Sequence, residues 1–156
     1  MPEFDVRRAT PDDTDAVRDL LLPAFEAYGN GLNAPRAQRL LGIRDQVAAG
    51  LAWMYYENND LVAVAIDDEI SDPITLPLHV LGVRLDLQSK GYGPRVMRHY
   101  EKHARERGFV KITLYTAEIF DHLIGFYTRM GYTELYRIPH PTKNDGILRV
   151  FFEKTI

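Results

Sequence analysis

Residues 81–95 have the sequence LGVRLDLQSKGYGPR, and this stretch decides the fold. Its first half continues an apolar run that predicts a strand over residues 76–85, followed by a Gln-x-x-Gly-x-Gly turn. A helix is expected directly after the turn, over about residues 93–107, with Gly108 as its terminator. The segment therefore predicts a strand, a glycine-rich turn and a helix in immediate succession.

The turn has the physical properties of an anion-binding site. Glycine permits a positive φ, and the first turn of a helix leaves its N–H groups without intrahelical partners. Those donors and the helix dipole attract negative charge, to which Lys90 and Arg95 add cationic side chains. A pyrophosphate would fit, although such glycine turns also occur in structural roles. A dinucleotide-binding fingerprint would need glycine in place of Val96, and a P-loop would need Gly-Lys-Ser/Thr, so both of those sites are excluded.

The other elements are expected on both sides of this segment. Periodicity and turn residues predict helices over 10–28, 37–49 and 118–130, and strands over 4–6, 51–57, 61–67, 110–114, 132–138 and 147–154. Gly29 ends the first helix, and a loop follows over 30–35. The order is β-α-α-β-β-β-α-β-α-β-β. It predicts one α/β domain, residues 1–156, with a mixed central β-sheet flanked by about four α-helices.

The composition limits the class of protein. Of 156 residues, 46% are hydrophobic and 26% are charged, which is enough apolar material for a core. No apolar run approaches the roughly 20 residues needed to span a bilayer, and no secretory signal is visible, so we expect a cytoplasmic protein with no membrane partner. The absence of cysteine excludes disulfides and cysteine nucleophiles. The net charge of −3 argues against a nucleic-acid partner.

Two further catalytic patterns are incomplete. His99 and His103 lie four apart on a predicted helix, but Tyr100 stands where a zincin has glutamate, so no metal is expected. Neither serine of the chain, Ser71 or Ser89, lies in a Gly-x-Ser-x-Gly motif, which argues against a serine hydrolase.

Charge is distributed unevenly along the chain. Residues 84–111 carry eight basic and three acidic side chains, a net charge of +5, so the rest of the chain carries −8. Taken alone, the basic stretch is explained as well by a solvated helix face as by an anion site. The acidic excess elsewhere favours a cationic amine as a partner.

Three motifs resemble the GNAT superfamily of N-acetyltransferases, and the resemblance covers nearly the whole chain. Residues 6–13 look like that family's first strand and helix start. Val83, Gln88, Gly91 and Gly93 have the spacing of its acyl-CoA pyrophosphate motif, and residues 126–132 resemble its second signature. The resemblance implies a GNAT-like fold, acetyl-CoA as cosubstrate, no metal, and a homodimer.

The resemblance also implies how acetyl-CoA is held. The strand before the turn would splay from its neighbour, and the pantetheine arm would lie in the gap. A strand N–H near Val83 would stabilise the carbonyl oxygen in the transition state. The implied cofactor-binding residues are Val83 and Leu85, through their backbone beside the arm, and Gln88, Ser89, Lys90, Gly91, Tyr92, Gly93, Pro94 and Arg95, around the pyrophosphate.

Two residues are candidates for proton transfer. By its place in the second signature, Tyr127 would protonate the leaving thiolate; otherwise it is a half-buried residue that packs on the sheet. His79 lies on the predicted central strand, on the side of Leu81 and Val83 by alternation, and would deprotonate the amine. A histidine at such a place is often a core residue, and Glu118 or a water chain are the other candidates for the base.

The acceptor is not encoded in any motif. In such folds its pocket is framed by the first two helices and the final hairpin loop, here about residues 25–49 and 139–146. We expect an N-acyltransferase that moves an acetyl group to the amine of a small molecule or peptide, by direct attack in a ternary complex. Two alternatives remain: a non-catalytic acyl-CoA-binding or sensor domain, and an interaction module that has kept only the fold.

Overall fold

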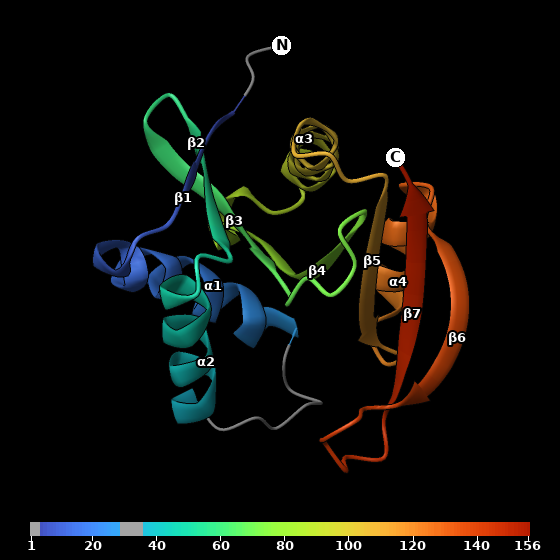
Figure 1. The fold of residues 1–156 in the computed structure, drawn as a ribbon. Coiled ribbons are helices and arrows are strands. Elements are labelled where there is room, and N and C mark those ends of the chain that lie inside the picture. Colours follow the sequence, from blue (N-terminus) through green and yellow to red (C-terminus); the bar gives the residue numbers. More distant parts are fainter. Residues whose placement is uncertain (1–3, 29–35) are drawn as a thin grey trace.

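A seven-stranded sheet with the order β1-β2-β3-β4-β5-β7-β6 forms the centre of the computed structural model (Figure 1). The structure describes residues 4–28 and 36–156, so the predicted loop 30–35 and the helix end at Gly29 lie outside the described residues. The strands are β1 (Asp5–Arg8), β2 (Ala52–Glu57), β3 (Asp60–Asp67), β4 (Thr75–Val83), β5 (Lys111–Ala117), β6 (Thr133–Pro139) and β7 (Leu148–Thr155).

Four α-helices occur in the described part of the chain, in the predicted order. They are α1 (Thr14–Tyr28), α2 (Arg36–Ala48), α3 (Tyr92–Glu106) and α4 (Asp121–Arg129), with short 3₁₀ turns η1 (Pro11–Asp13) and η3 (Leu85–Leu87). The mixed α/β fold with about four helices is thus confirmed. Within the described residues, no helix has the length and apolar character that a membrane span requires.

The helices cover the two faces of the sheet in pairs. Helices α1 and α2 pack through Val17, Leu21 and Val47 on one face, where these side chains are at most 1% exposed. Helices α3 and α4 pack on the other face through a cluster that includes Met97 and Tyr127. Burial of apolar area in these two clusters is the main stabilising contribution to the fold.

The centre of the sheet is open because β4 and β5 diverge. Their parallel pairing runs only from Thr75–Leu78 against Lys111–Leu114. Beyond it, β4 stays paired with β3 as far as Val83, and β5 stays paired with β7 as far as Ala117. The two halves of the sheet therefore separate into a V-shaped gap, which Figure 1 shows between β4 and β5.

A bulge in β4 marks the start of this gap. Ile66 pairs with Val80, but the next β3 residue, Asp67, pairs with Leu78, so His79 is the extra residue. Leu78 and Leu81 consequently pack in the same cluster, although strict alternation would place them on opposite faces. Strict alternation therefore does not hold across His79, and the predicted side of this residue stays a prediction.

The bulge is anchored by a buried carboxylate. Asp67 is 1% exposed and accepts hydrogen bonds from Tyr100 (2.6 Å), Trp53 (3.0 Å) and Arg107 (3.2 Å). A buried carboxyl group with three donors, one of them cationic, is well compensated, and these donors come from β2, α3 and the C-cap of α3. These bonds fix the irregular segment at which the strand pairing changes.

Candidate active site

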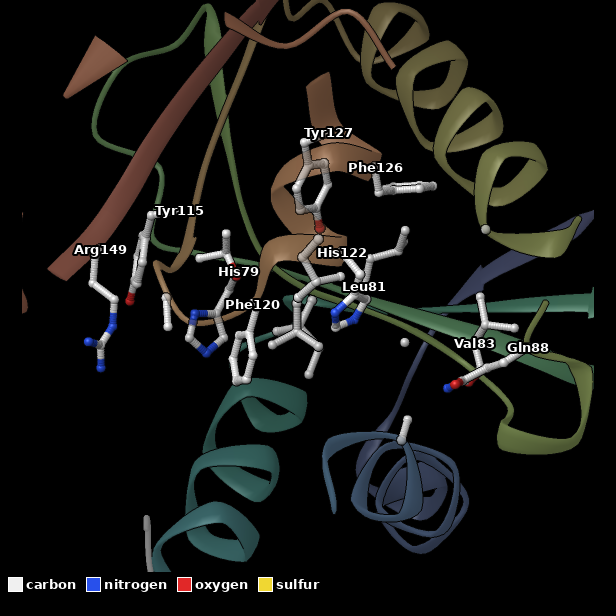
Figure 2. A pocket seen from close by; sticks show the side chains of 18 of the residues that line it. His79, Leu81, Val83, Gln88, Tyr115, Phe120, His122, Phe126, Tyr127 and Arg149 are labelled. Carbon is white, nitrogen blue, oxygen red and sulfur yellow. The ribbon is translucent and has the colours of Figure 1, made fainter. Parts of the chain in front are cut away.

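A cavity of about 860 Å³ lies where β4 and β5 diverge. Its described walls come from the ends of both strands, α1, α2 and α4, the turn before α3 and the loop after β6. Two ends can be distinguished in Figure 2, with Val83 and Gln88 at one side and Tyr115 and Arg149 at the other. We call Val83, Gln88, Ser89, Gly91, Gly93 and Pro94 the turn end, and Tyr115, His140, Lys143 and Arg149 the distal end.

The edge of β4 turns backbone groups toward the gap. Arg84 N–H donates to the Val62 carbonyl at 2.9 Å, which makes this a hydrogen-bonded pair of the antiparallel ladder. Because such pairs alternate with non-bonded ones, Leu81 and Val83 direct their N–H and C=O groups away from β3 and into the gap. The Val83 carbonyl accepts a hydrogen bond from Gln88 Nε2 at 3.2 Å. Strand edge and turn are thus joined.

The turn itself has the positive-φ conformation that favours glycine. Ser89 has φ 63° and Gly91 has φ 83°, and Gly91 is the N-cap of α3. No side chain caps this helix, so its first amides are left for another acceptor. At Gly93, an added Cβ would lie 3.4 Å from the Phe126 ring, so α4 packs directly against the turn.

Four predicted cofactor-binding residues do not line the cavity. Leu85 lies in η3, beyond the end of β4 rather than within it, and is 47% exposed. The side chains of Tyr92 and Arg95 bond Glu57 of β2, at 2.5 and 2.7 Å, and Lys90 is exposed. The Arg95 side chain therefore ties α3 to the sheet, although its backbone belongs to the first helical turn.

The Glu57 contacts have an electrostatic consequence. Hydrogen bonds from Tyr92 and then Arg95 hold the pKa of the Glu57 carboxyl below its usual value. The same bond to Glu57 raises the pKa of the Tyr92 phenol. Tyr92 is thereby kept as a neutral donor to Glu57.

Tyr127 comes from α4 and is 8% exposed. Figure 2 shows its phenol oxygen pointing into the cavity between the two ends. Its ring has edge contacts with Phe126 at 5.2 Å and Tyr132 at 5.8 Å. Tyr132 is itself fixed by a 2.8 Å bond to buried Glu101, so the packing that orients Tyr127 is rigid.

His79 lines the cavity from the bulge of β4, and Figure 2 shows it between Tyr127 and the distal end. Although the His79 side chain is exposed, desolvation by the surrounding protein lowers the pKa of its imidazole; Asp68 opposes this, and Lys143 lowers the pKa further. A lowered pKa keeps the ring neutral at pH 7, the form that can accept a proton. Glu118, by contrast, accepts the Leu148 N–H at 3.2 Å and is not among the lining residues.

Several lining residues carry no sequence motif. Phe120, His122, Tyr115, His140, Lys143 and Arg149 come from β5, the start of α4, the β6–β7 loop and β7. Only the pairing of β5 with β7 brings Tyr115 and Arg149 to one end of the gap. The described lining contains Arg129, Lys143 and Arg149 but no carboxylate, so the acidic excess of the chain does not extend to it.

Over residues 4–28 and 36–156, no three His, Cys, Asp or Glu side chains are grouped to hold a metal ion. His103 instead makes an edge contact with Trp53 at 4.7 Å, which gives it a packing role on the inner side of α3.

Solved structures share the fold at low identity. A putative GNAT-family acetyltransferase from Desulfovibrio desulfuricans is similar with a TM-score of 0.76 and 16% identity, over 97% of this chain and 98% of that chain. The PaiA N-acetyltransferase of Thermoplasma acidophilum, in complex with coenzyme A, is similar with a TM-score of 0.74 and 12% identity, over 99% of this chain and 100% of that chain.

Sequence comparison adds the family. A probable N-acetyltransferase 14 from Xenopus tropicalis is 27% identical over 77 residues, which cover 49% of this chain and 37% of that protein. The match thus spans well under half of this relative. The profile of the acetyltransferase (GNAT) family matches residues 14–132, which is most of the chain and includes the turn, α3 and α4. The chain therefore belongs to the acetyltransferase (GNAT) family.

Proposed function

We propose that residues 1–156 form a single N-acetyltransferase domain that moves an acetyl group from acetyl-CoA to the amine of a small molecule or peptide. The observation that carries the proposal is one continuous surface, in which the gap-facing edge of β4 leads directly into a positive-φ turn and the N-terminus of α3. The first element suits an extended amide-containing arm, and the second suits a pyrophosphate.

The residues present fit an acyl-CoA. The gap-facing groups of Leu81 and Val83 would pair with the amides of the arm, in the manner of an added strand. The amides around Ser89, Gly91 and Gly93 would receive the pyrophosphate. The relative in complex with coenzyme A has the same fold, which supports this assignment.

Acetyl-CoA supplies the acetyl group as a thioester, which an amine can attack without a covalent enzyme intermediate. A C–N bond forms and the C–S bond breaks. His79 would take the proton that the amine loses, and Tyr127 would give its phenol proton to the thiolate, whose acid has a pKa of about 8.5. A gap-facing N–H of β4 would stabilise the carbonyl oxygen as it gains charge.

Two measurements test the proposal in order. Coenzyme A at 100 times its dissociation constant should stabilise the protein by about 2.7 kcal/mol in a thermal shift experiment. Thiol release from acetyl-CoA should then depend on an added amine. Binding without amine-dependent release would indicate the non-catalytic sensor instead, and no thermal shift would contradict acyl-CoA binding altogether.

A further inference from the structure

The distal end of the cavity is separate from the turn end and has its own chemistry. Figure 2 shows Arg149 and Tyr115 on the side opposite Val83 and Gln88, with His79 nearer the distal end. If acyl-CoA enters by the turn end, the distal end is left for the acceptor. Its side chains should therefore define which amine is used.

Arg149 is a buried cation with a fixed orientation. It is 3% exposed, and its guanidinium bonds Asp145 at 2.7 and 3.3 Å and the Ile147 carbonyl at 2.7 Å. Its side chain has five N–H donors, and three are used by these bonds within the described part of the chain. Two donors are not used by these bonds, and Arg149 is among the residues that line the cavity.

Asp145 holds this cation without removing the positive character of the distal end. The Arg149 hydrogen bond holds the pKa of the Asp145 carboxyl at about 2, so the carboxylate is ionised at neutral pH. Asp145 itself is not among the residues that line the cavity. It compensates the charge of Arg149 from outside the described lining, and its bonds use only part of the guanidinium.

His140 presents a further donor. Its Nδ1 accepts the backbone N–H groups of Thr142 (3.1 Å) and Lys143 (3.0 Å). Because Nδ1 is an acceptor, the neutral ring must carry its hydrogen on Nε2. Burial, Arg149 and Lys143 lower the pKa of His140, which favours this neutral form. The two backbone bonds also fix the plane of the ring.

The charge balance at the distal end favours a monoanion. Arg149 with Asp145 sums to zero, His140 is neutral, and Lys143 adds one positive charge. Asp68 raises the pKa values of His79 and Tyr115 through its charge, and it is not among the described lining residues. A carboxylate would match the single positive charge, whereas a phosphate dianion would exceed it.

We propose that the distal end binds the carboxylate of a small acceptor that carries both an amine and a carboxylate, with its amine directed toward His79. The Arg149 and His140 donors would orient the carboxylate, and Lys143 would supply the net charge. This inference rests on the proposed acetyl transfer and names the class of acceptor for it.

The test compares matched acceptors. Thiol release is measured with amino acids, with the corresponding amino acid amides, and with aminoalkyl phosphates. The acids should have a kcat/KM at least about tenfold above that of their amides, because the amide leaves the cationic donors without an anion. Equal kcat/KM for acid and amide, or a preference for the phosphates, would overturn the inference.

Two variants test whether the preference for acids over amides arises at the distal end. Lys143→Glu reverses the charge of an exposed side chain at the distal end, and it should raise the KM of the acids about tenfold while leaving those of the amides and acetyl-CoA close to wild type. Arg105→Glu makes the same charge change on an exposed residue of α3 outside the cavity, and it is the control. Identical behaviour of the two variants would contradict the assignment.

A binding experiment separates this inference from the proposed function. The melting temperature is measured with each acid and each amide, with and without coenzyme A. A shift by acids but not amides supports the distal site even if no transfer is detected, and equal shifts, or none with either ligand, count against it. The response to coenzyme A alone tests the proposed function independently.

Discussion

The two ends of the cavity are built from different parts of the chain and by different means. The turn end comes from one continuous segment, residues 83–94, and offers mainly backbone groups of Val83 and Gly91. The distal end is assembled from β5, the β6–β7 loop and β7, and offers the side chains of Tyr115, His140 and Arg149. Backbone recognition tolerates sequence change, whereas side-chain recognition depends on each residue. This division between backbone and side-chain recognition is expected if the cosubstrate is the same across a family while the acceptor varies.

The largest expected effect is at Tyr127, which lies between the two ends. We predict that Tyr127→Phe lowers kcat by about 10²- to 10³-fold while coenzyme A affinity changes little, because only the proton for the thiolate is lost. Steady-state kinetics and a thermal shift with coenzyme A measure the two quantities. Tyr136→Phe, on an exposed tyrosine of β6, is the control, and equal turnover in both variants would refute the acid role.

His79 should show the next largest effect, and a pH dependence. We expect His79→Gln to lower kcat/KM about 10²-fold at pH 7. In the wild type the base works only when neutral, so activity should fall as pH drops through the pKa of His79, which desolvation lowers from its usual value. The acidic limb of the pH profile should disappear in the variant. A limb that persists unchanged would mean that another group is the base.

The smallest effects are expected from alanine substitutions at one positive-φ glycine in each end of the cavity. Gly91 has φ 83° and Gly146, in the distal loop, has φ 72°, and neither would bring a new Cβ within 4 Å of another atom. Alanine at either position should therefore cost about 1 kcal/mol of stability through strain alone. Gly91→Ala should also weaken coenzyme A binding about fivefold, measured by calorimetry, while Gly146→Ala should not. The opposite pattern would reverse the assignment of the ends.

Local signals predicted most of the fold. The apolar periodicity of α1 and α3 gave helices within a few residues of those observed, and the predicted terminator Gly108 follows α3 closely. The strand before the turn was predicted two residues too long, since Leu85 lies in η3. There the chain must bend to reach the helix, and a 3₁₀ turn provides that bend. The last helix begins at Asp121, three residues after the predicted start, because Glu118 N–H bonds the Leu148 carbonyl and continues β5 pairing.

The turn end was also predictable in outline, but its side chains were not. A Gln-x-x-Gly-x-Gly sequence before a helix indicates an anion site because the relevant donors belong to the backbone. Arg95 was expected to add charge to that site, yet it pairs with Glu57, which is distant in sequence. Such a partner depends on how β2 lies beside α3, and no local pattern encodes it.

The sequence by itself determined the order of strands and helices, the glycine turn and the family resemblance, because each depends on residues close together in the chain. The resemblance implied that the strand before the turn splays from its neighbour. The tertiary structure alone decided that the divergence of β4 and β5 begins after Leu78, that a bulge places His79 at the gap, and that Arg149 and His140 share one end of the cavity. These features arise from strand register between distant segments. Register is set by the sum of packing across the whole sheet, and it is therefore visible only when the chain is folded.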